Sequence, residues 1–203
     1  MSRWYDLIAG ESEKKFTDAG LQLLNAQKGE TILEIGYGTG WSMLTLAKAV
    51  GESGKVYGLD LSEGMYRITS QRLADAGFTE RVVLNCGDAA NLPFENDFFD
   101  AVFISFTLEL FDTPEIPTVL YECHRVLHKG GRIGIVSMAK KANPSLIVRL
   151  YEWAHEKIPN YIDCRPIYTS LSVQQAGFEI IKTKEMMMWG LPVDLVLAQK
   201  PSI

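Results

Sequence analysis

The stretch ILEIGYGTG, residues 32–40, decides the fold of this chain. An apolar run interrupted by Glu34 leads into three glycines, Gly36, Gly38 and Gly40, at every second position. A short apolar run of this kind predicts a buried strand. Glycines let the backbone turn tightly and approach a ligand closely. The stretch therefore predicts a strand, a turn with a ligand site, and a helix beginning near Trp41.

The glycine spacing departs from the dinucleotide-binding pattern GxGxxG. In that pattern the third glycine would stand at position 41, where this chain has Trp41. The turn therefore fits a pyrophosphate poorly, and the identity of its ligand has to come from the rest of the chain.

Short β-branched runs alternate with helical periodicity on both sides of this stretch. We expect strands at 31–35, 55–61, 81–86, 99–106, 132–138, 178–188 and 191–199. We expect helices at 41–50, 62–76, 114–127, 145–158 and 169–176. The first helix should bury Met43, Leu44, Leu46, Ala47 and Val50, and the second should bury Met65, Ile68, Leu73 and Ala76.

Alternation of strands and helices predicts an α/β fold with a doubly wound, mostly parallel sheet. The turn at 189–191 is too short for a crossover helix, so the last two strands should pair antiparallel. We interpret residues 1–203 as one domain with four parts: an N-terminal helical segment (1–29), a ligand-binding core (30–138), a substrate-side insertion (139–168), and a C-terminal helix with a β-hairpin (169–203).

The composition narrows the function classes. The net charge is −5, from 20 basic and 25 acidic residues, which weighs against a nucleic-acid partner. No apolar run is long enough for a membrane span, and the N-terminus lacks the apolar core of a signal peptide. Cys86, Cys123 and Cys164 lack metal-ligand spacing. We expect a cytoplasmic protein with reduced thiols and no metal, as a monomer or homodimer.

Two acidic residues at strand ends indicate the ligand. Asp60 ends the second strand, where a carboxylate can accept hydrogen bonds from both hydroxyls of a ribose. Asp88, in CGDAANLPF at 86–94, can accept a hydrogen bond from an adenine amino group, and Ala89 is small enough for the ring to lie flat. The shared inference is an adenosine moiety.

The remaining pattern selects among adenosine ligands. No tyrosine has a lysine four residues later, as short-chain nicotinamide enzymes need, and GxxxxGK[ST] is absent. Glu34 would repel a pyrophosphate but would attract an ammonium group. Ribose, adenine and an amino-acid tail occur together in S-adenosyl-L-methionine.

The chain resembles the class I S-adenosylmethionine-dependent methyltransferases. The motifs ILEIGYGTG, VYGLDLSEGM, CGDAANLPF, FDAVFISFTLEL and HRVLHKGGRIGIV follow in the family's order. The closest resemblance is to the ubiquinone/menaquinone C-methyltransferase-like subgroup (methyltransferase type 11). It covers residues 30–138 well and implies a Rossmann-like, seven-stranded sheet of order 3-2-1-4-5-7-6 with strand 7 antiparallel.

The resemblance also implies a set of residues that bind the cofactor. Asp60 would hold the ribose, Leu61 and Met65 would pack by the adenine, and Ser105 would line the methionine side. The full implied set is Tyr5, Glu34, Gly36, Tyr37, Gly38, Thr39, Gly40, Asp60, Leu61, Met65, Gly87, Asp88, Ala89, Ser105 and Phe106. S-adenosyl-L-homocysteine would be the product.

The acceptor is less constrained. In quinone C-methyltransferases Arg-Asn typically follows the ISF-x-L motif, whereas this chain has Glu109 and Leu110. A small, hydrophobic or aromatic acceptor is expected, such as a quinone, lipid or metabolite. The predicted aromatic pocket comprises Trp4, Tyr5, Tyr151, Trp153, Tyr161 and Trp189.

His155 is the candidate catalytic base, because the unperturbed pKa of histidine lies near neutrality. Asp163 and Arg165 are expected to pair with each other. Two alternatives to a methyltransferase remain open: a cofactor-binding module without catalysis that regulates a partner, and a nicotinamide-dependent oxidoreductase.

Overall fold

The computed structural model of the 203-residue chain describes residues 3–141 and 165–202, with side chains from Glu13 onward. Its centre is one seven-stranded sheet of order β3-β2-β1-β4-β5-β7-β6, which confirms the predicted order. The strands are β1 (Thr31–Ile35), β2 (Lys55–Asp60), β3 (Val82–Cys86), β4 (Phe99–Ser105), β5 (Leu127–Met138), β6 (Glu179–Met188) and β7 (Leu191–Gln199).

Only β7 runs against its neighbours. It pairs antiparallel with both β5 and β6, whereas the pairs among β1 to β5 are parallel. The turn between β6 and β7 places Trp189 and Gly190 at positive φ, +50° and +83°, as a tight hairpin requires. The reversed strand predicted from the short 189–191 turn is therefore confirmed.

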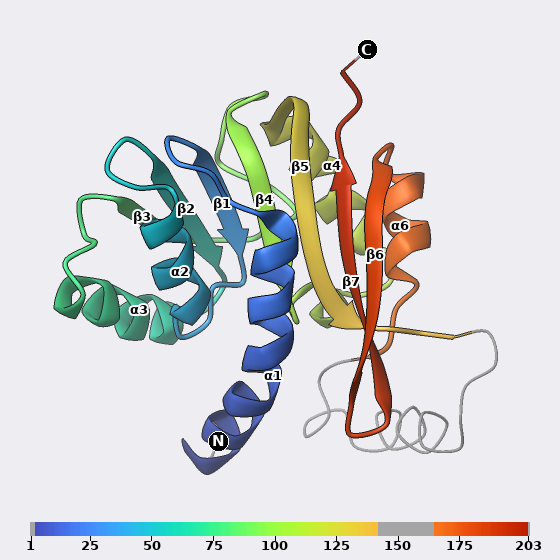
Figure 1. The fold of residues 1–203 in the computed structure, drawn as a ribbon, viewed down its shortest axis with the longest axis horizontal. Coiled ribbons are helices and arrows are strands. Elements are labelled where there is room, and N and C mark those ends of the chain that lie inside the picture. The colour runs from blue at the N-terminus through green and yellow to red at the C-terminus, as the bar shows by residue number, and fades with distance from the viewer. Residues whose placement is uncertain (1–2, 142–164, 203) are drawn as a thin grey trace.

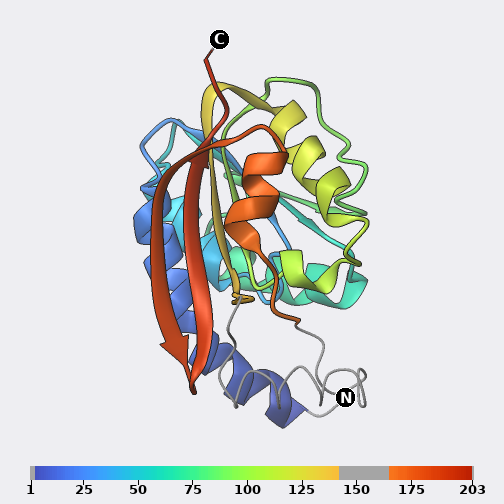
Figure 2. The same cartoon turned by 90° about the vertical axis from the view of Figure 1, so that its right-hand side faces the viewer.

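Helices cover both faces of the sheet (Figures 1 and 2). On one face lie α1 (Arg3–Leu24), α2 (Trp41–Ala49) and α3 (Glu63–Asp75), which share one apolar cluster. On the other lie α4 (Ile116–Val126) and α6 (Thr169–Gln175), which share a second cluster. A 3-10 turn, η1 (Leu108–Leu110), follows β4. This two-layered core fixes the strand ends that carry the site.

Two expected boundaries were wrong. The helix expected over 114–127 ends at Val126, and the strand expected at 132 begins at Leu127. Leu127 pairs with Phe99, and the register then shifts before Arg132 meets Ala101. Gly130 and Gly131 bond with the backbone of Lys200 at 3.0 and 2.8 Å, so they join the sheet instead of forming a loop. The expected helix at 145–158 lies outside the described residues.

The buried face of α3 also differs from the expected stripe. Ile68 is 46% exposed and Ala76 is exposed, whereas Thr69 and Leu73 are buried. The Thr69 hydroxyl donates to the Gly38 carbonyl oxygen at 2.7 Å. A polar residue on the core face thus ties the helix to the glycine turn, which an apolar pattern does not reveal. In α2, by contrast, Met43, Leu46 and Ala47 are buried as expected.

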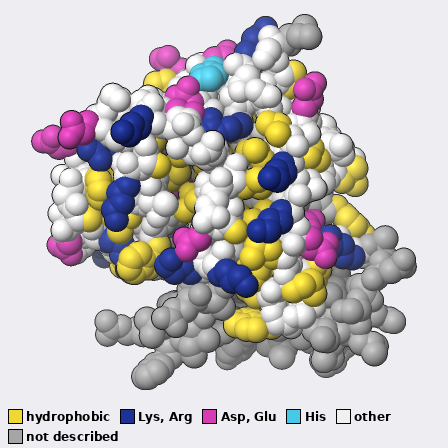
Figure 3. Space-filling view, in the orientation of Figure 1, with side chains coloured by type: hydrophobic (Ala, Val, Ile, Leu, Met, Phe, Trp, Pro, Cys, Tyr) yellow, Lys and Arg dark blue, Asp and Glu magenta, His cyan; other side chains and the backbone are white. Residues whose placement is uncertain are grey.

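The edge strand β6 leaves most of its side chains exposed. Figure 3 shows basic and hydrophobic side chains side by side on the face that carries α1 and β6. Across the described residues, no helix combines the length and apolarity that a membrane crossing needs.

Candidate cofactor and acceptor site

The glycine turn after β1 is built around left-handed backbone. Gly36, Gly38 and Gly40 have φ of +73°, +49° and +81°, a region that L side chains rarely adopt. A Cβ at Gly36 would collide with the side chain of Thr107, and one at Gly40 would lie 2.6 Å from Thr69. The turn needs glycine at these two positions for lack of space as well as for its dihedral angles.

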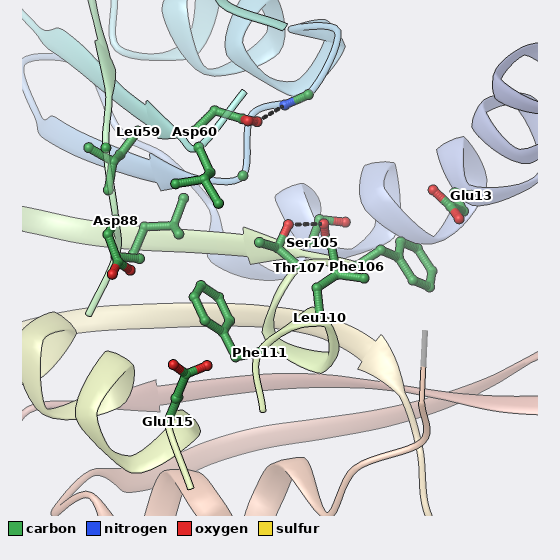
Figure 4. A pocket seen from close by; sticks show the side chains of 16 residues that line it. Glu13, Leu59, Asp60, Asp88, Ser105, Phe106, Thr107, Leu110, Phe111 and Glu115 are labelled. Carbon is green, nitrogen blue, oxygen red and sulfur yellow. Dashed lines mark hydrogen bonds between the residues drawn. The ribbon is translucent and has the colours of Figure 1, made fainter. Parts of the chain in front are cut away.

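A cavity of about 530 Å³ opens at the carboxyl ends of β1, β2 and β4, next to this turn (Figure 4). This is where an open α/β sheet binds its ligands, beside the point where the strand order reverses. The lining residues are Glu13, Ile35, Gly36, Gly38, Leu59, Asp60, Leu61, Gly87, Asp88, Ala89, Ser105, Phe106, Thr107, Leu110, Phe111 and Glu115.

Asp60 is held in place by the turn that it faces. Its Oδ2 accepts a hydrogen bond from the Gly38 amide and its Oδ1 accepts one from the Ser62 amide, both at 2.9 Å. Each carboxylate oxygen can accept a second hydrogen bond. The side chain is therefore fixed while it keeps acceptor capacity for a pair of vicinal hydroxyls.

The loop after β3 supplies the next part of the wall. Asp88 is anchored by the Ala90 amide, which donates to its Oδ1 at 2.9 Å. Gly87 and the buried Ala89 flank it, and Leu61, 78% exposed, lies across from them at the end of β2. A flat apolar ring fits between these small and aliphatic groups, with the Asp88 carboxylate at its edge.

A second, smaller cavity of about 160 Å³ adjoins the first on the α1 side. The two share five lining residues, Glu13, Gly36, Gly38, Ser105 and Phe106. The smaller one is also lined by Lys14, Thr17, Asp18, Glu34, Tyr37, Thr39, Trp41 and Ser42.

Glu34 presents an unsatisfied oxygen in this smaller cavity. The carboxyl is fully buried, its Oε1 accepts a hydrogen bond from the Ser42 hydroxyl, and its Oε2 has no partner. Burial, with a smaller contribution from the charge on Asp60, raises its pKa to about 8. A buried acceptor without a donor is costly, and a ligand ammonium would satisfy it. The donor set therefore fits an amino-acid group next to an adenosine site.

Some of the expected residues do not reach the large cavity. Tyr37 is buried and its hydroxyl donates to the Asn85 carbonyl at 3.3 Å, so with Thr39 it lines the smaller cavity only. Gly40 precedes α2 as its N-cap residue. Met65 packs against the core cluster of α1, α2 and α3. Of these four residues, Gly40 and Met65 line neither of the two cavities, and Tyr37 and Thr39 line only the smaller one.

The expected acceptor residues are largely outside the described part of the chain. His155, Tyr151, Trp153, Tyr161 and Asp163 fall there, and the side chains of Trp4 and Tyr5 are not described. Trp189 is 69% exposed at the hairpin tip. The Arg165 guanidinium donates to the Phe111 carbonyl oxygen, at the edge of the large cavity.

Sequence reasoning missed the wall opposite the adenosine side. Glu13 comes from α1, Thr107 follows β4, Leu110 belongs to η1, and Phe111 and Glu115 precede α4. Phe106, which was expected, stands at φ +50°, a costly conformation for a bulky residue and common at functional sites. Glu13 lies far from every cofactor motif along the chain, so no local pattern could have identified it.

The charges on the large cavity have one sign. Glu13, Asp60, Asp88 and Glu115 contribute carboxyl groups, and no lysine or arginine lines it among the described residues. Among those residues no group of three or more His, Cys, Asp or Glu side chains is arranged to hold a metal. The site therefore suits a ligand that carries positive charge and hydrogen-bond donors.

Comparison with known proteins agrees with this arrangement. Residues 32–131 match a family model, Methyltransf_25, described as a methyltransferase domain. The chain is 38% identical over 127 residues to a protein of Bacillus subtilis (strain 168) named demethylmenaquinone methyltransferase, a match that covers 63% of this chain and 53% of that protein. The chain spans about half the length of the curated relatives it matches.

Solved structures share the fold at low identity. A geranyl diphosphate methyltransferase in complex with GPP and sinefungin superposes with a TM-score of 0.77 at 17% identity, covering 93% of this chain and 77% of that one. The [4+2]-cyclase SpnF superposes with a TM-score of 0.75 at 19% identity, covering 92% and 80%. Since a cyclase also has this fold, the fold alone does not define the reaction.

The sheet order, the glycine turn with its acidic strand ends and the family match support one another. Residues 32–131 of this chain therefore belong to the class I S-adenosylmethionine-dependent methyltransferase family.

Proposed function

We propose that this chain transfers a methyl group from S-adenosyl-L-methionine to a small, uncharged aromatic acceptor of the quinol type. The observation that carries the proposal is the division of one cavity into two walls. Asp60 and Asp88 stand on one wall, whereas Phe106, Leu110 and Phe111 stand on the other.

The residues of the first wall would bind the cofactor. Asp60 would accept hydrogen bonds from the ribose hydroxyls, Asp88 one from the adenine amino group, and Glu34 one from the ammonium group; their anchored or unpartnered carboxyl oxygens support these roles. When bound, the cofactor supplies a methyl group on a positively charged sulfur. Since that carbon is already a strong electrophile, the protein mainly has to align the acceptor and exclude water.

The second wall supports the choice of acceptor. Phe106, Leu110 and Phe111 form an apolar surface, and the described lining has no cation that would bind a phosphate or carboxylate. An uncharged, flat acceptor satisfies both conditions. The name of the Bacillus subtilis relative supports a quinone-type compound, although Glu109 and Leu110 replace the Arg-Asn typical of such enzymes.

The rest of the expected setting belongs to the same proposal. Residues 139–168 belong to this proposal as a substrate-side insertion, with His155 as one candidate base in that segment. The partner would be a small molecule, and the place of action would be the cytoplasm.

Calorimetry and a methyl-transfer assay test the two halves of the proposal. We expect S-adenosylhomocysteine to bind, and Asp60→Ala to weaken it by about 10–100-fold, because charge-assisted hydrogen bonds contribute about 1.5–3 kcal/mol. Asp75→Ala, at an exposed site on α3, is the control and should leave binding unchanged. Absence of binding, with Asp60→Ala equal to the unmodified chain, would contradict the cofactor assignment.

The second half uses radiolabelled S-adenosylmethionine with 1,4-naphthoquinol kept under a reductant. A labelled, mass-identified methyl product supports the acceptor class. Tight cofactor binding with no product from this probe or from a panel of phenols and metabolites would instead favour a binding module without catalysis.

A further inference from the structure

Glu13 is the one ionisable side chain, among the described residues, that lines both cavities. It projects from α1 beside Phe106, and it lies away from Asp88 and Glu115 in Figure 4. Glu34, whose Oε2 has no partner, lines the smaller cavity, and the apolar wall lines the larger one. Glu13 therefore stands where the amino-acid end of the cofactor and the acceptor would meet.

The Glu13 carboxyl has no hydrogen-bond partner within the described part of the chain. Burial raises its pKa to about 7, so it changes charge near neutral pH. The nearest lysine on its own helix, Lys14, is paired with Asp18 at 2.7 Å. Within the described residues, the other ionisable groups that line the two cavities or lie behind them are Asp18, Glu34, Tyr37, Asp60, Asp88, Glu109 and Glu115. The Arg165 guanidinium lies at the edge of the large cavity, where it donates to the Phe111 carbonyl oxygen.

The charge on Glu13 acts on a second buried carboxyl, Glu109. Its Oε1 accepts a hydrogen bond from the Met138 amide at 2.9 Å, and its Oε2 has no partner. Burial raises the pKa of Glu109 to about 8, and the charge on Glu13 contributes to that rise. Because two close carboxyls resist ionising together, Glu109 keeps its proton while Glu13 loses one.

We propose that Glu13 is the general base that removes the proton from the acceptor's nucleophilic group during methyl transfer, an inference that rests on the proposed function. The oxygen of the deprotonated hydroxyl, or the ring carbon that shares its charge, forms a bond to the methyl carbon while the sulfur–methyl bond breaks and its electron pair stays on sulfur. A ring carbon that has been methylated then gives up its proton, and the oxygen regains one. The proton of the acceptor hydroxyl goes to a Glu13 carboxylate oxygen. The products are the methylated acceptor, neutral-sulfur S-adenosylhomocysteine and protonated Glu13.

The other carboxyls of the site are less suited to this step. Asp60 is committed to the Gly38 and Ser62 amides, and Asp88 to the Ala90 amide. Glu34 and Glu109 are fully buried, with raised pKa values. A base has to face the acceptor, be without a hydrogen-bond partner and have a pKa near the working pH. Glu13 lines the large cavity, has no such partner among the described residues, and has a pKa raised to about 7.

The test compares Glu13→Gln with Glu13→Asp and with Glu52→Gln, the same amide change at an exposed turn outside the cavities. With 1,4-naphthoquinol as probe, we expect Glu13→Gln to lower kcat by about 100-fold or more. We expect its calorimetric Kd for S-adenosylhomocysteine to stay within about threefold, since only a transition-state contact is lost. Glu13→Asp should recover part of kcat, and Glu52→Gln should equal the unmodified chain.

The pH profile gives a readout that a structural role would not move. In the unmodified chain kcat/KM should rise with pH through an apparent pKa near 7, because the base has to be ionised. In Glu13→Gln this rise of kcat/KM with pH, the limb with an apparent pKa near 7, should be absent. Turnover by Glu13→Gln within about threefold of the unmodified chain, with the limb retained, would overturn the proposal.

A measurement without acceptor separates this inference from the proposed function. Carbon-13 NMR of labelled glutamate carboxyls, with S-adenosylhomocysteine bound and Glu13→Gln for assignment, should show Glu13 titrating near pH 7. A Glu13 titration at the ordinary glutamate value of about 4.3 would overturn the base assignment. If the unmodified chain methylates no naphthoquinol, the acceptor class is wrong, and this titration still decides for or against Glu13.

Discussion

Residues 35–89 supply the side of the cavity that we propose for the adenosine, from the ends of β1, β2 and β3. The opposite side is assembled from α1, the segment after β4, and the segment before α4. On the first side the backbone carries the geometry. The Gly38 amide holds Asp60 at 2.9 Å, the Gly38 carbonyl holds Thr69 at 2.7 Å, and Arg72 donates to the Thr39 carbonyl.

On the second side the geometry depends on side chains from distant parts of the chain. Leu110 is 52% exposed, Phe106 holds a strained backbone angle, and Glu109 is tied to Met138 of β5. A wall held by backbone hydrogen bonds suits a ligand that is the same in every enzyme of this fold. A wall made of side chains from loops and helix ends can differ between enzymes that use different acceptors. Variants in the two walls should therefore separate cofactor binding from acceptor use.

The largest effect is expected in the glycine turn. Gly36→Ala places a Cβ against the Thr107 side chain at φ +73°, so we expect about 1–3 kcal/mol of lost stability and at least about tenfold weaker S-adenosylhomocysteine binding. Denaturant unfolding and calorimetry measure the two effects.

Gly77→Ala is the matched control, because its φ is +74° and no atom lies within 4 Å of the added Cβ. It should cost about 1 kcal/mol of stability, as for other glycines at positive φ, and leave cofactor binding intact. If Gly36→Ala and Gly77→Ala weakened S-adenosylhomocysteine binding equally, the glycine turn would have no specific role in binding the cofactor.

An intermediate effect is expected at Glu109. Burial raises the pKa of its carboxyl to about 8, so the folded state holds a proton that the unfolded state releases above about pH 4.3. The contribution of this group to stability is thus full below pH 4.3 and is lost as the pH rises towards 8. Glu109→Gln cannot ionise and so does not lose this contribution. The free energy of unfolding of the variant, minus that of the unmodified chain, should therefore be larger at pH 8 than at pH 5 by about 1 kcal/mol or more.

Unfolding by urea at pH 5 and pH 8 measures this difference. Glu122→Gln is the control with a pKa shift of the opposite sign. In the unmodified chain the hydrogen bond between Glu122 and Arg125 lowers the pKa of the Glu122 carboxyl. Its stabilising effect is present above the unfolded pKa, so the variant should lose stability at both pH values. An unchanged pH slope in Glu109→Gln would mean that the Glu109 carboxyl ionises normally in the folded chain.

The smallest effect is expected on the apolar wall. Phe111→Ala removes a half-buried ring from the acceptor side, so we expect KM for naphthoquinol to rise about three- to tenfold with no change in the Kd of S-adenosylhomocysteine. Steady-state kinetics and calorimetry check both values. Phe98→Ala removes the same atoms at the other end of β4 and should leave KM unchanged. A weaker cofactor in Phe111→Ala would mean that the two walls are not separable.

The fold was accessible from the sequence where local signals were strong. Ser62 caps α3 through the Met65 amide at 3.3 Å, and the Trp189-Gly190 turn reverses β7. The predictions were wrong at positions where a hydrogen bond to a distant part of the chain decided the structure and the local sequence pattern did not. Thr69 replaced Ile68 on the buried face because its hydroxyl bonds to the glycine turn, and Gly130 joined β5 through Lys200.

The sequence alone predicted which residues gather on the side of the cavity that we propose for the adenosine. Asp60 ends a strand of the parallel part of the sheet, and Gly36, Gly38 and Asp88 each follow one. The carboxyl ends of such strands lie at one edge of the sheet. For these residues, a place at the end of a predicted strand is enough to locate them at the same edge of the sheet. Their residue types, glycine and aspartate, then indicate close backbone approach and hydrogen-bond acceptance.

The place of Glu13 was decided only by the tertiary structure. The Phe16 ring packs edge-on against Phe106 at 6.3 Å, and the Thr17 hydroxyl lies 2.8 Å from that of Ser105. These contacts bring α1 to the end of β4 across almost 90 residues of chain, and they also carry Glu13 to the junction of the two cavities. Such a position depends on the packing of a whole helix, which no spacing within a motif encodes.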